Sequence, residues 1–206
     1  ATSVAYQQDV RISDEIMKQI SENYRKIRNT MRFVLGNLND FKQSDLVAVN
    51  DLTDVDKYML VELNNLIDGY HQAYDNYDFA DANQQILNYF TNVLSSFYMD
   101  FTKDILYIEK ADSLRRRQVQ TVLYYHAKAM MKLISPVLVF TAEELHDHFH
   151  CDENKAESIF LEPNVEKVVI ENSDEIKSYF DRFLLLRKDV LKVLETLRND
   201  KVIKSN

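Results

Sequence analysis

Residues 13–38 read SDEIMKQISENYRKIRNTMRFVLGNL, and this stretch indicates most clearly what kind of fold the chain forms. Ser13 is a favourable N-cap residue, and Asp14 and Glu15 supply the negative charge that a first helical turn favours. At about 100° per residue, the apolar side chains gather on one face. The stretch therefore predicts a long amphipathic helix. Its apolar face consists of Ile16, Ile20, Tyr24, Ile27, Met31 and Val34.

The opposite face of this predicted helix is a basic ridge. Lys18, Arg25, Arg28 and Arg32 lie about 120–200° around the helix axis from the first isoleucine of the apolar face. Glu22 is the one acid close to them, so most of the ridge lacks a partner three or four residues away. One interpretation is a solvated face that keeps the helix soluble. The other is a surface that binds an anion.

The remaining sequence also favours helices, because it has only two glycines and two prolines in 206 residues and its apolar residues recur at spacings of three and four. We predict an all-α fold, a helical bundle of about five helices. A second helix is expected to open with the capping pair Thr53 and Asp56. A third is expected over Phe79–Tyr107, and a fourth from Asp112 or Ser113 to just before Pro136. A short helix opens with the capping box Thr141–Glu144 and ends near Phe149, and the last one is capped by Asn172 with Glu175.

We expect a single domain, with the bundle over residues 13–149, an irregular acidic excursion over residues 150–171, and a C-terminal helix in residues 172–206. Within the excursion, Lys167–Ile170 is a possible short strand. The last helix is predicted to carry one apolar stripe inward. That stripe consists of Tyr179, Phe183, Leu186, Val190, Val193 and Leu197.

Composition excludes several classes of function. With Gly36 and Gly69 as its only glycines, the chain holds no glycine-rich dinucleotide loop, phosphate loop or nucleophile elbow. The single Cys151 forms no internal disulfide, and no signal peptide is recognisable, so we expect a cytoplasmic protein. No run approaches the ~18 apolar residues of a membrane span.

The formal net charge of −8 argues against a nucleic-acid partner, but the charge is unevenly distributed. Residues 1–38 carry six bases against four acids, and residues 103–132 carry seven against three. Residues 39–87 and 143–175 hold ten and eleven acids against two bases each. The second basic segment includes Arg115, Arg116 and Arg117 in the first turn of a predicted helix, where the helix dipole disfavours cations. These arginines therefore have a use other than helix formation.

Two patterns resemble metal sites weakly. Residues 146–152, HDHFHCD, combine histidine, cysteine and aspartate, but they lack a second cysteine pair. Glu143 with His146, and Asp68 with His71, have the spacing of di-iron bundle ligands. However, Asp68 is expected on the polar face of its helix. We interpret both patterns as polar helix surface. Tyr98, Asp100, Lys103 and Tyr107 lie on one aromatic-rich helix, where we expect a buried tyrosine hydroxyl to bond a carboxylate.

Several stretches resemble the C-terminal helical region of the bacterial-type isoleucyl-tRNA synthetase family, and together they cover essentially the whole chain. The resemblance is most specific in YRKIRNT, residues 24–30. It is also carried by DVRIS at residues 9–13, GNLNDF at 36–41, DKYML at 56–60, FYMDFTKDILY at 97–107, RRQVQTVL at 116–123 and PVLVFTAEE at 136–144. The chain departs from the family at His146, where tryptophan is usual, and at Glu162–Pro163, where Phe-Pro is commoner.

The resemblance implies an anticodon-binding helical domain that follows a class I catalytic domain. The chain has no His-Ile-Gly-His signature and no Lys-Met-Ser-Lys-Ser loop, so we expect it to be a non-catalytic fragment of an isoleucine–tRNA ligase. Residues 1–12 would connect it to the catalytic domain, and residues 201–206 would lead into a zinc-bearing tail. We expect no cofactor in this chain; ATP, magnesium and zinc belong to the other parts of such an enzyme.

The expected partners are the isoleucine tRNA, tRNA(Ile), and the catalytic domain of the same polypeptide, in a monomeric protein. Part of the basic ridge could instead pack on that catalytic domain, and the acidic segments would restrict docking to one face. An alternative is a helical protein-interaction module whose arginines meet an acidic partner surface. The residues expected to contact tRNA are Arg25, Lys26, Arg28, Arg32, Arg115, Arg116 and Arg117.

Overall fold

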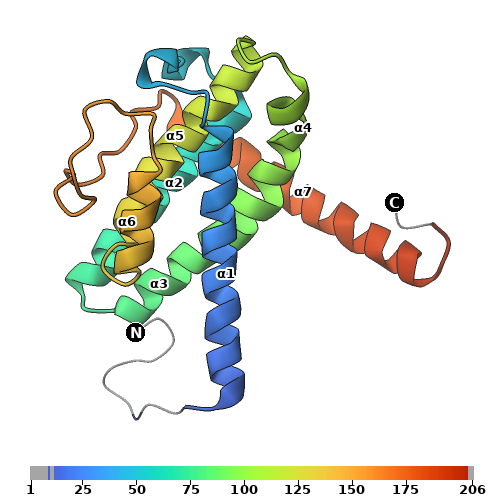
Figure 1. The fold of residues 1–206 in the computed structure, drawn as a ribbon. Coiled ribbons are helices and arrows are strands. Elements are labelled where there is room, and N and C mark those ends of the chain that lie inside the picture. The colour runs from blue at the N-terminus through green and yellow to red at the C-terminus, as the bar shows by residue number, and fades with distance from the viewer. Residues whose placement is uncertain (1–8, 10–11, 204–206) are drawn as a thin grey trace.

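A computed structural model describes residue 9 and residues 12–203 of the chain (Figure 1). Every regular element in that part is helical, which confirms the predicted all-α class. Most of the expected connector at residues 1–12 lies outside the described residues. The helices are α1 (Asp14–Asn37), α2 (Asp54–Asp75), α3 (Phe79–Asn88), the π-helix η3 (Tyr89–Met99), α4 (Asp100–Ile108), α5 (Leu114–Ile134), α6 (Val139–Asp147) and α7 (Ser173–Asn199), with the short 3-10 helices η1 (Gln43–Asp45) and η2 (Val49–Asp51).

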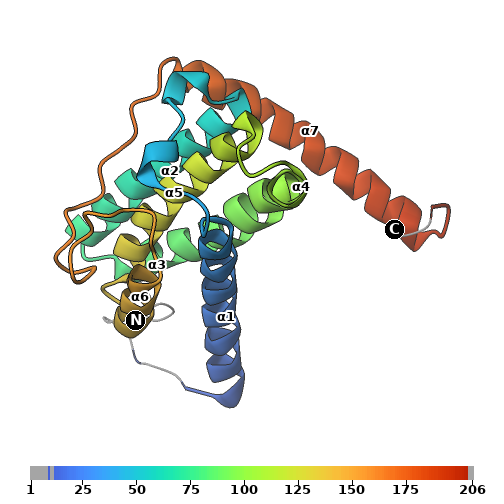
Figure 2. The same cartoon turned by 45° about the horizontal axis from the view of Figure 1, so that its top comes forward.

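Helix α5 forms the centre of the bundle. It packs against α1, α2, α4 and α6, and most of its residues from Gln118 onward are buried. Figures 1 and 2 show it running through the molecule with these helices around it. A helix that is apolar nearly all round is stable only when it is surrounded. The core therefore lies along α5, and the loops at its ends place the polar groups described below.

The helix caps show which local predictions the fold respects. Ser13 is an N-cap as predicted, and of the two predicted starts Asp112 and Ser113 it is Ser113 that caps α5. Each serine hydroxyl accepts a hydrogen bond from the backbone N–H three residues later. Thr53 precedes α2 as predicted, but its hydroxyl donates to the carboxylate of Asp56 at 2.6 Å. The capping box at Thr141 is wrong. Helix α6 already begins at Val139, and the Thr141 hydroxyl instead meets that of Tyr24 at 3.2 Å.

The helix predicted over Phe79–Tyr107 is one continuous helical run, but its middle third is a π-helix. The Ser96 hydroxyl donates to the carbonyl of Thr91, five residues earlier, at 2.6 Å. The wider winding buries the aromatic side chains of Tyr89, Phe90 and Tyr98. These rings give this segment its place against α2 and α5.

The excursion at residues 150–171 is irregular as expected, but the strand suggested at 167–170 is absent from it. Val168 has both its backbone groups bonded by one side chain. The Asn64 amide donates to its carbonyl at 2.7 Å, and the Asn64 carbonyl oxygen accepts from its N–H at 3.0 Å. An amide on α2 thus replaces the neighbouring strand that extended backbone would otherwise need.

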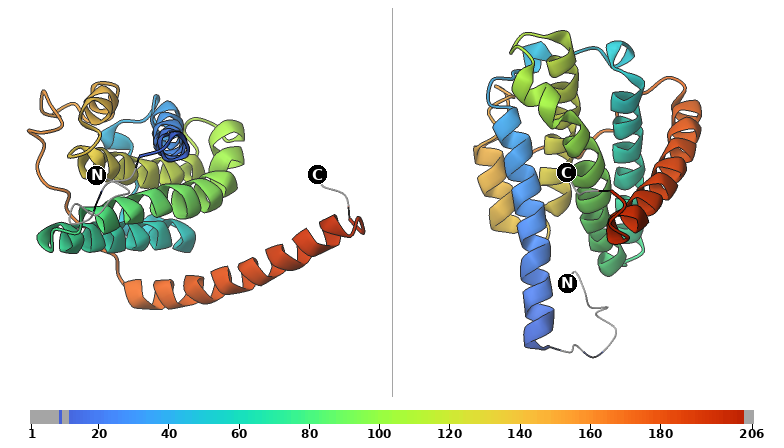
Figure 3. Two further views of the ribbon diagram at one scale, coloured as in Figure 1. Left: turned by 90° about the horizontal axis from the view of Figure 1, so that it is seen from below. Right: turned by 90° about the vertical axis from the view of Figure 1, so that its right-hand side faces the viewer.

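Helix α7 contradicts the prediction of its inward face. Phe180 is its one buried residue, stacked on Tyr58 of α2 with ring centroids 4.7 Å apart. The predicted stripe is largely exposed; Leu186, for example, is 62% exposed. The apolar arc of α7 is wide enough for two stripes, and the one that packs contains Ile176, Phe180 and Leu184. The rest of the helix projects from the bundle (Figure 3).

Helix α1 also leaves the bundle at one end, its N-terminal one (Figure 3). Of its predicted apolar face, Met31 and Val34 are buried, whereas Ile20 is 37% exposed. The second half of α1 is therefore the part anchored against α5, and the basic residues of that half are held on a rigid element.

Candidate nucleic-acid interface

The basic ridge of α1 is exposed, as its sequence predicts. Arg25 bonds the carboxylate of Glu22 at 2.7 Å, in a pair whose two side chains both remain largely in solvent. Lys26, Arg28 and Arg32 are exposed, and no ion pair involves them within the described part of the chain. Three uncompensated cations therefore lie along two turns of a well-anchored helix.

On one side of Arg32 lies a groove of about 480 Å³ between α1 and the end of α6. Arg28 and Arg32 line one wall, and His148 and His150 line the other. Glu144 is the one carboxylate among the residues that line it. The sequence-based list of site residues missed both histidines, because their place opposite α1 depends on how α6 packs.

On the other side of Arg32 lies a second hollow, of about 510 Å³, which reaches Tyr107 at the end of α4. Tyr107 is 68% exposed, and its ring meets that of Phe33 edge to face with centroids 6.3 Å apart. The exposed ring therefore offers aromatic surface to the hollow. Sequence reasoning missed this residue too, although its position beside predicted basic residues in an aromatic-rich helix was a usable signal.

Arg115, at the start of α5, is engaged inside the fold. Its guanidinium donates to both carboxylate oxygens of Asp56, one of them through Nη2 at 3.3 Å. The Tyr98 hydroxyl donates to the same carboxylate at 2.7 Å, so a buried tyrosine of that helix bonds an acid as predicted, whereas Tyr107 is exposed. Burial raises the pKa of Tyr98 well above its usual range, so the hydroxyl keeps its proton.

Arg116 and Arg117 are held by the segment that follows α1. Arg116 bonds Asp40 through two nitrogens, at 2.5 and 3.0 Å, and its side chain is only 12% exposed. Arg117 donates to the Asp40 carbonyl at 3.0 Å and lies over the ring of Phe41. The hydrogen bond from Arg116 lowers the pKa of Asp40, so the carboxylate stays charged. These arginines were expected to have a use other than helix formation. That use is to bind other segments of the same molecule.

The predicted site residues thus fall into two groups. Arg25, Arg28 and Arg32 form one exposed face, and Lys26 is exposed outside it, about 160° around the helix from Arg28. The three arginines of α5 form a clamp, which joins the start of that helix to α2 and to the turn after α1. Their contact with tRNA stays a prediction, whereas their contact with the aspartates is observed.

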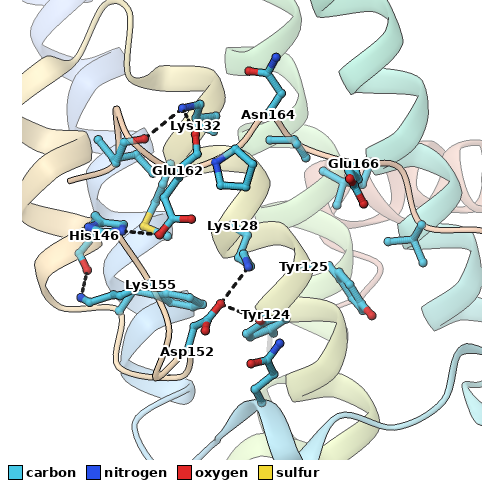
Figure 4. A pocket seen from close by; sticks show the side chains of 18 of the residues that line it. Tyr124, Tyr125, Lys128, Lys132, His146, Asp152, Lys155, Glu162, Asn164 and Glu166 are labelled. Carbon is cyan, nitrogen blue, oxygen red and sulfur yellow. Dashed lines mark hydrogen bonds and ion pairs between the residues drawn. The ribbon is translucent and has the colours of Figure 1, made fainter. Parts of the chain in front are cut away.

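A cavity of about 360 Å³ lies between α5 and the excursion (Figure 4). Lys128 points to Asp152, with 3.0 Å between Nζ and the carboxylate, and His146 points to Glu162 at 3.1 Å. Lys132 donates to the carbonyls of Ile159 and Glu162. The cations at this cavity are used to fasten the excursion to the bundle.

The two weak metal patterns do not converge. His146 is buried, His150 is exposed, and the Cys151 thiol lies 3.5 Å from the carbonyl of Leu38. Asp68 is exposed as expected and pairs with Lys167 at 2.9 Å. Within residues 12–203, no three histidine, cysteine, aspartate or glutamate side chains are grouped to hold a metal ion. Nor does any helix there have the length and apolarity needed to cross a membrane.

Comparison with known proteins matches the sequence of the chain to a family. The family described as the anticodon-binding domain of tRNA ligase matches residues 56–206. The chain is 52% identical over 203 residues to isoleucine–tRNA ligase of Bacillus subtilis (strain 168), and equally so to those of Bacillus mycoides (strain KBAB4) and Bacillus cereus (strain B4264). Each alignment covers 98% of this chain and 22% of the relative. The resemblance seen in the sequence is thereby confirmed: the chain belongs to the anticodon-binding domain family of tRNA ligases, and it corresponds to about a fifth of an isoleucine–tRNA ligase.

Proposed function

We propose that the chain binds the anticodon stem and loop of tRNA(Ile) through the face centred on the second half of α1. The observation that carries this proposal is the pair of exposed, uncompensated cations Arg28 and Arg32 on one face of α1, with Arg32 between two hollows. Phosphate contacts from lysine and arginine supply most of the affinity of such interfaces. A helix anchored at Met31 and Val34 holds these cations in a fixed row.

Tyr107 gives the same face a means of binding unpaired bases. Loop bases of RNA are splayed out and stack on aromatic rings or guanidinium planes. The exposed ring of Tyr107 and the guanidinium of Arg32 line one hollow, so a base that enters it meets both kinds of surface. The ridge would hold the backbone, and this hollow would hold a base.

The acidic segments support one-sided docking. Residues 39–87 and 143–175 carry most of the negative charge, and their uncompensated acids would repel phosphate from other faces. Asp40, the first acid after the ridge in sequence, is paired with Arg116. Asp40 therefore reduces the attraction of the ridge for phosphate less than its position in the sequence would imply.

The activity of the longer protein is part of the proposal. In a polypeptide of the relatives' length, the remaining regions would carry the isoleucine and ATP chemistry, with magnesium and zinc, and would charge tRNA(Ile). The chain itself would contribute recognition only. We further propose a monomeric, cytoplasmic protein, in which α1 also meets the catalytic domain.

The test is filter binding of the 206-residue chain to a transcript of tRNA(Ile), with a non-cognate tRNA as competitor. We expect the double variant Arg28→Ala/Arg32→Ala to bind roughly tenfold more weakly and to lower the slope of log affinity against log salt by about 2. The matched control is Lys188→Ala/Lys192→Ala, which removes two exposed cations from α7. Unchanged affinity and slope in the α1 variant would favour an acidic protein partner instead.

A further inference from the structure

The groove beside Arg32 gathers four nitrogen-bearing side chains from distant parts of the sequence. Arg28 and Arg32 come from α1, and His148 and His150 come from the end of α6, more than a hundred residues later. All four are exposed, and none has a side-chain hydrogen bond or ion pair with any described residue. The two imidazoles contact each other edge to face, with centroids 6.5 Å apart. The groove therefore presents two guanidinium and two imidazole groups, with Glu144 as its one carboxylate.

The local sequence around the histidines is acidic, yet most nearby carboxylates are used by the fold. Glu143 accepts from the backbone N–H of Ile159 at 3.1 Å. Asp152 pairs with Lys128, and Glu162 pairs with His146. Glu144 is the acid that remains at the groove, against four groups able to donate hydrogen bonds. The fold thus converts an acidic stretch of sequence into a wall suited to an anion.

His146 shows that this arrangement is particular to two of the three histidines. It lies in the last turn of α6, where it is buried and directed at Glu162 (Figure 4). Where α6 ends at Asp147, the chain turns so that His148 and His150 are exposed on either side of the buried Phe149. Because Phe149 is buried and the residues before and after it are exposed, both imidazoles lie at the groove.

We propose that this groove binds a backbone phosphate of the RNA, with His148 and His150 completing from the opposite wall a site begun by Arg28 and Arg32. This inference rests on the proposed function. Phosphate oxygens only accept hydrogen bonds, and guanidinium and imidazole N–H groups supply the matching donors. The RNA contact surface then extends from α1 across the groove to the end of α6.

The test uses the 206-residue chain and a tRNA(Ile) transcript, and compares His148→Gln/His150→Gln with His148→Lys/His150→Lys. We expect the glutamine variant to lose several-fold in affinity. The lysine variant should restore the affinity, because lysine supplies a donor to phosphate at each position. The matched control is His71→Gln, which removes an exposed imidazole on α2 and should bind like the unmodified chain.

The outcomes separate this inference from the proposed function. If Arg28→Ala/Arg32→Ala weakens binding but the glutamine variant does not, the histidine wall is wrong and the proposed function stands. If the glutamine variant weakens binding and lysine does not restore it, a phosphate contact at these positions is likewise wrong. If neither variant changes affinity or salt slope, the RNA face itself is wrong.

Discussion

Asp56 is fully buried and is held by one cation and two hydroxyl groups, so this single residue has a large influence on the stability of the fold. It accepts hydrogen bonds from Arg115, from Tyr98 at 2.7 Å and from Thr53 at 2.6 Å. These donors come from α5, from η3 and from the residue that precedes α2. A buried carboxylate is tolerated when it is paired and hydrogen-bonded in this way, and it is costly when it loses a partner.

Removing the cation from this site should destabilise the fold strongly. We expect Arg115→Ala to lower the free energy of unfolding by about 3–5 kcal/mol, because it leaves a buried charge without its counter-ion. Urea unfolding followed by circular dichroism measures the change. The matched control is Lys103→Ala, which breaks the exposed pair with Asp100 and should cost less than about 1 kcal/mol. Equal losses in the two variants would contradict the clamp.

His126 makes the stability depend on pH. Its Nδ1 donates to the Val122 carbonyl at 2.7 Å, and its Nε2 accepts from the Tyr89 hydroxyl at 2.9 Å. Burial lowers the pKa of His126 to about 4. Below about pH 6.5 the unfolded chain binds a proton on this imidazole that the folded chain does not bind, so stability falls until about pH 4.

Between about pH 6.5 and pH 4, the neutral state of His126 should lower the free energy of unfolding by about 3 kcal/mol. We expect His126→Gln to be less stable than the unmodified chain at pH 7, and the difference to narrow as the pH falls toward 4, since glutamine does not titrate. Urea unfolding at a series of pH values measures both. A difference that stays constant with pH would show that the imidazole is not kept neutral by burial.

Among the helices, α7 shows that an amphipathic pattern does not by itself determine which apolar stripe of a helix packs. We expect Leu186→Ser, on the exposed stripe, to change the free energy of unfolding by no more than about 0.5 kcal/mol. Phe180→Ala, on the packed stripe, should cost about 3–5 kcal/mol because it removes the stack on Tyr58. Thermal or urea unfolding of the two variants decides between the stripes. The reverse order of losses would restore the face predicted from sequence.

Helix α1 carries a glycine that its packing does not require. A Cβ added at Gly36 would meet no atom within 4 Å, and the backbone there does not have a positive φ. We expect Gly36→Ala to raise the free energy of unfolding by about 0.5–1 kcal/mol, because alanine loses less backbone entropy in a helix. Gly69→Ala should gain less, since its Cβ would lie 2.4 Å from Oε1 of Gln85 and that side chain must move. Equal gains at the two positions would contradict this.

In the whole molecule, the excursion depends on the bundle for its position. Lys132 of α5 donates to the carbonyls of Ile159 and Glu162, and Lys128 pairs with Asp152. We expect Lys132→Ala to speed amide hydrogen exchange in residues 153–166 while leaving the helices protected. Hydrogen exchange read by mass spectrometry measures this, with Lys188→Ala as the exposed control. Unchanged exchange in the excursion would show that other contacts hold it.

The sequence was sufficient for most of the helices and for the family, but not for the start of α6, for the π-helix η3 or for residues 167–170, where it suggested a strand. Apolar residues at helical spacing, scarce glycine and proline, and caps such as Ser13 and Ser113 are local features, so they predicted where helices begin and end. The exposed basic ridge of α1 was also predictable, because it needs only the angle between side chains on one helix. The motif at residues 24–30 led to the family for the same reason: it is a property of consecutive residues.

The hydrogen-bond and ion-pair partner of each side chain depended on the assembled bundle. Arg116 meets Asp40 across 76 positions of sequence, and Arg115 meets Asp56 across 59, so no local pattern could separate these arginines from those of the ridge. The inward face of α7 and the place of His148 and His150 opposite Arg28 were equally undetermined. Periodicity sets the face a helix offers, whereas burial and ion pairing require a second segment, and only tertiary packing chooses that segment.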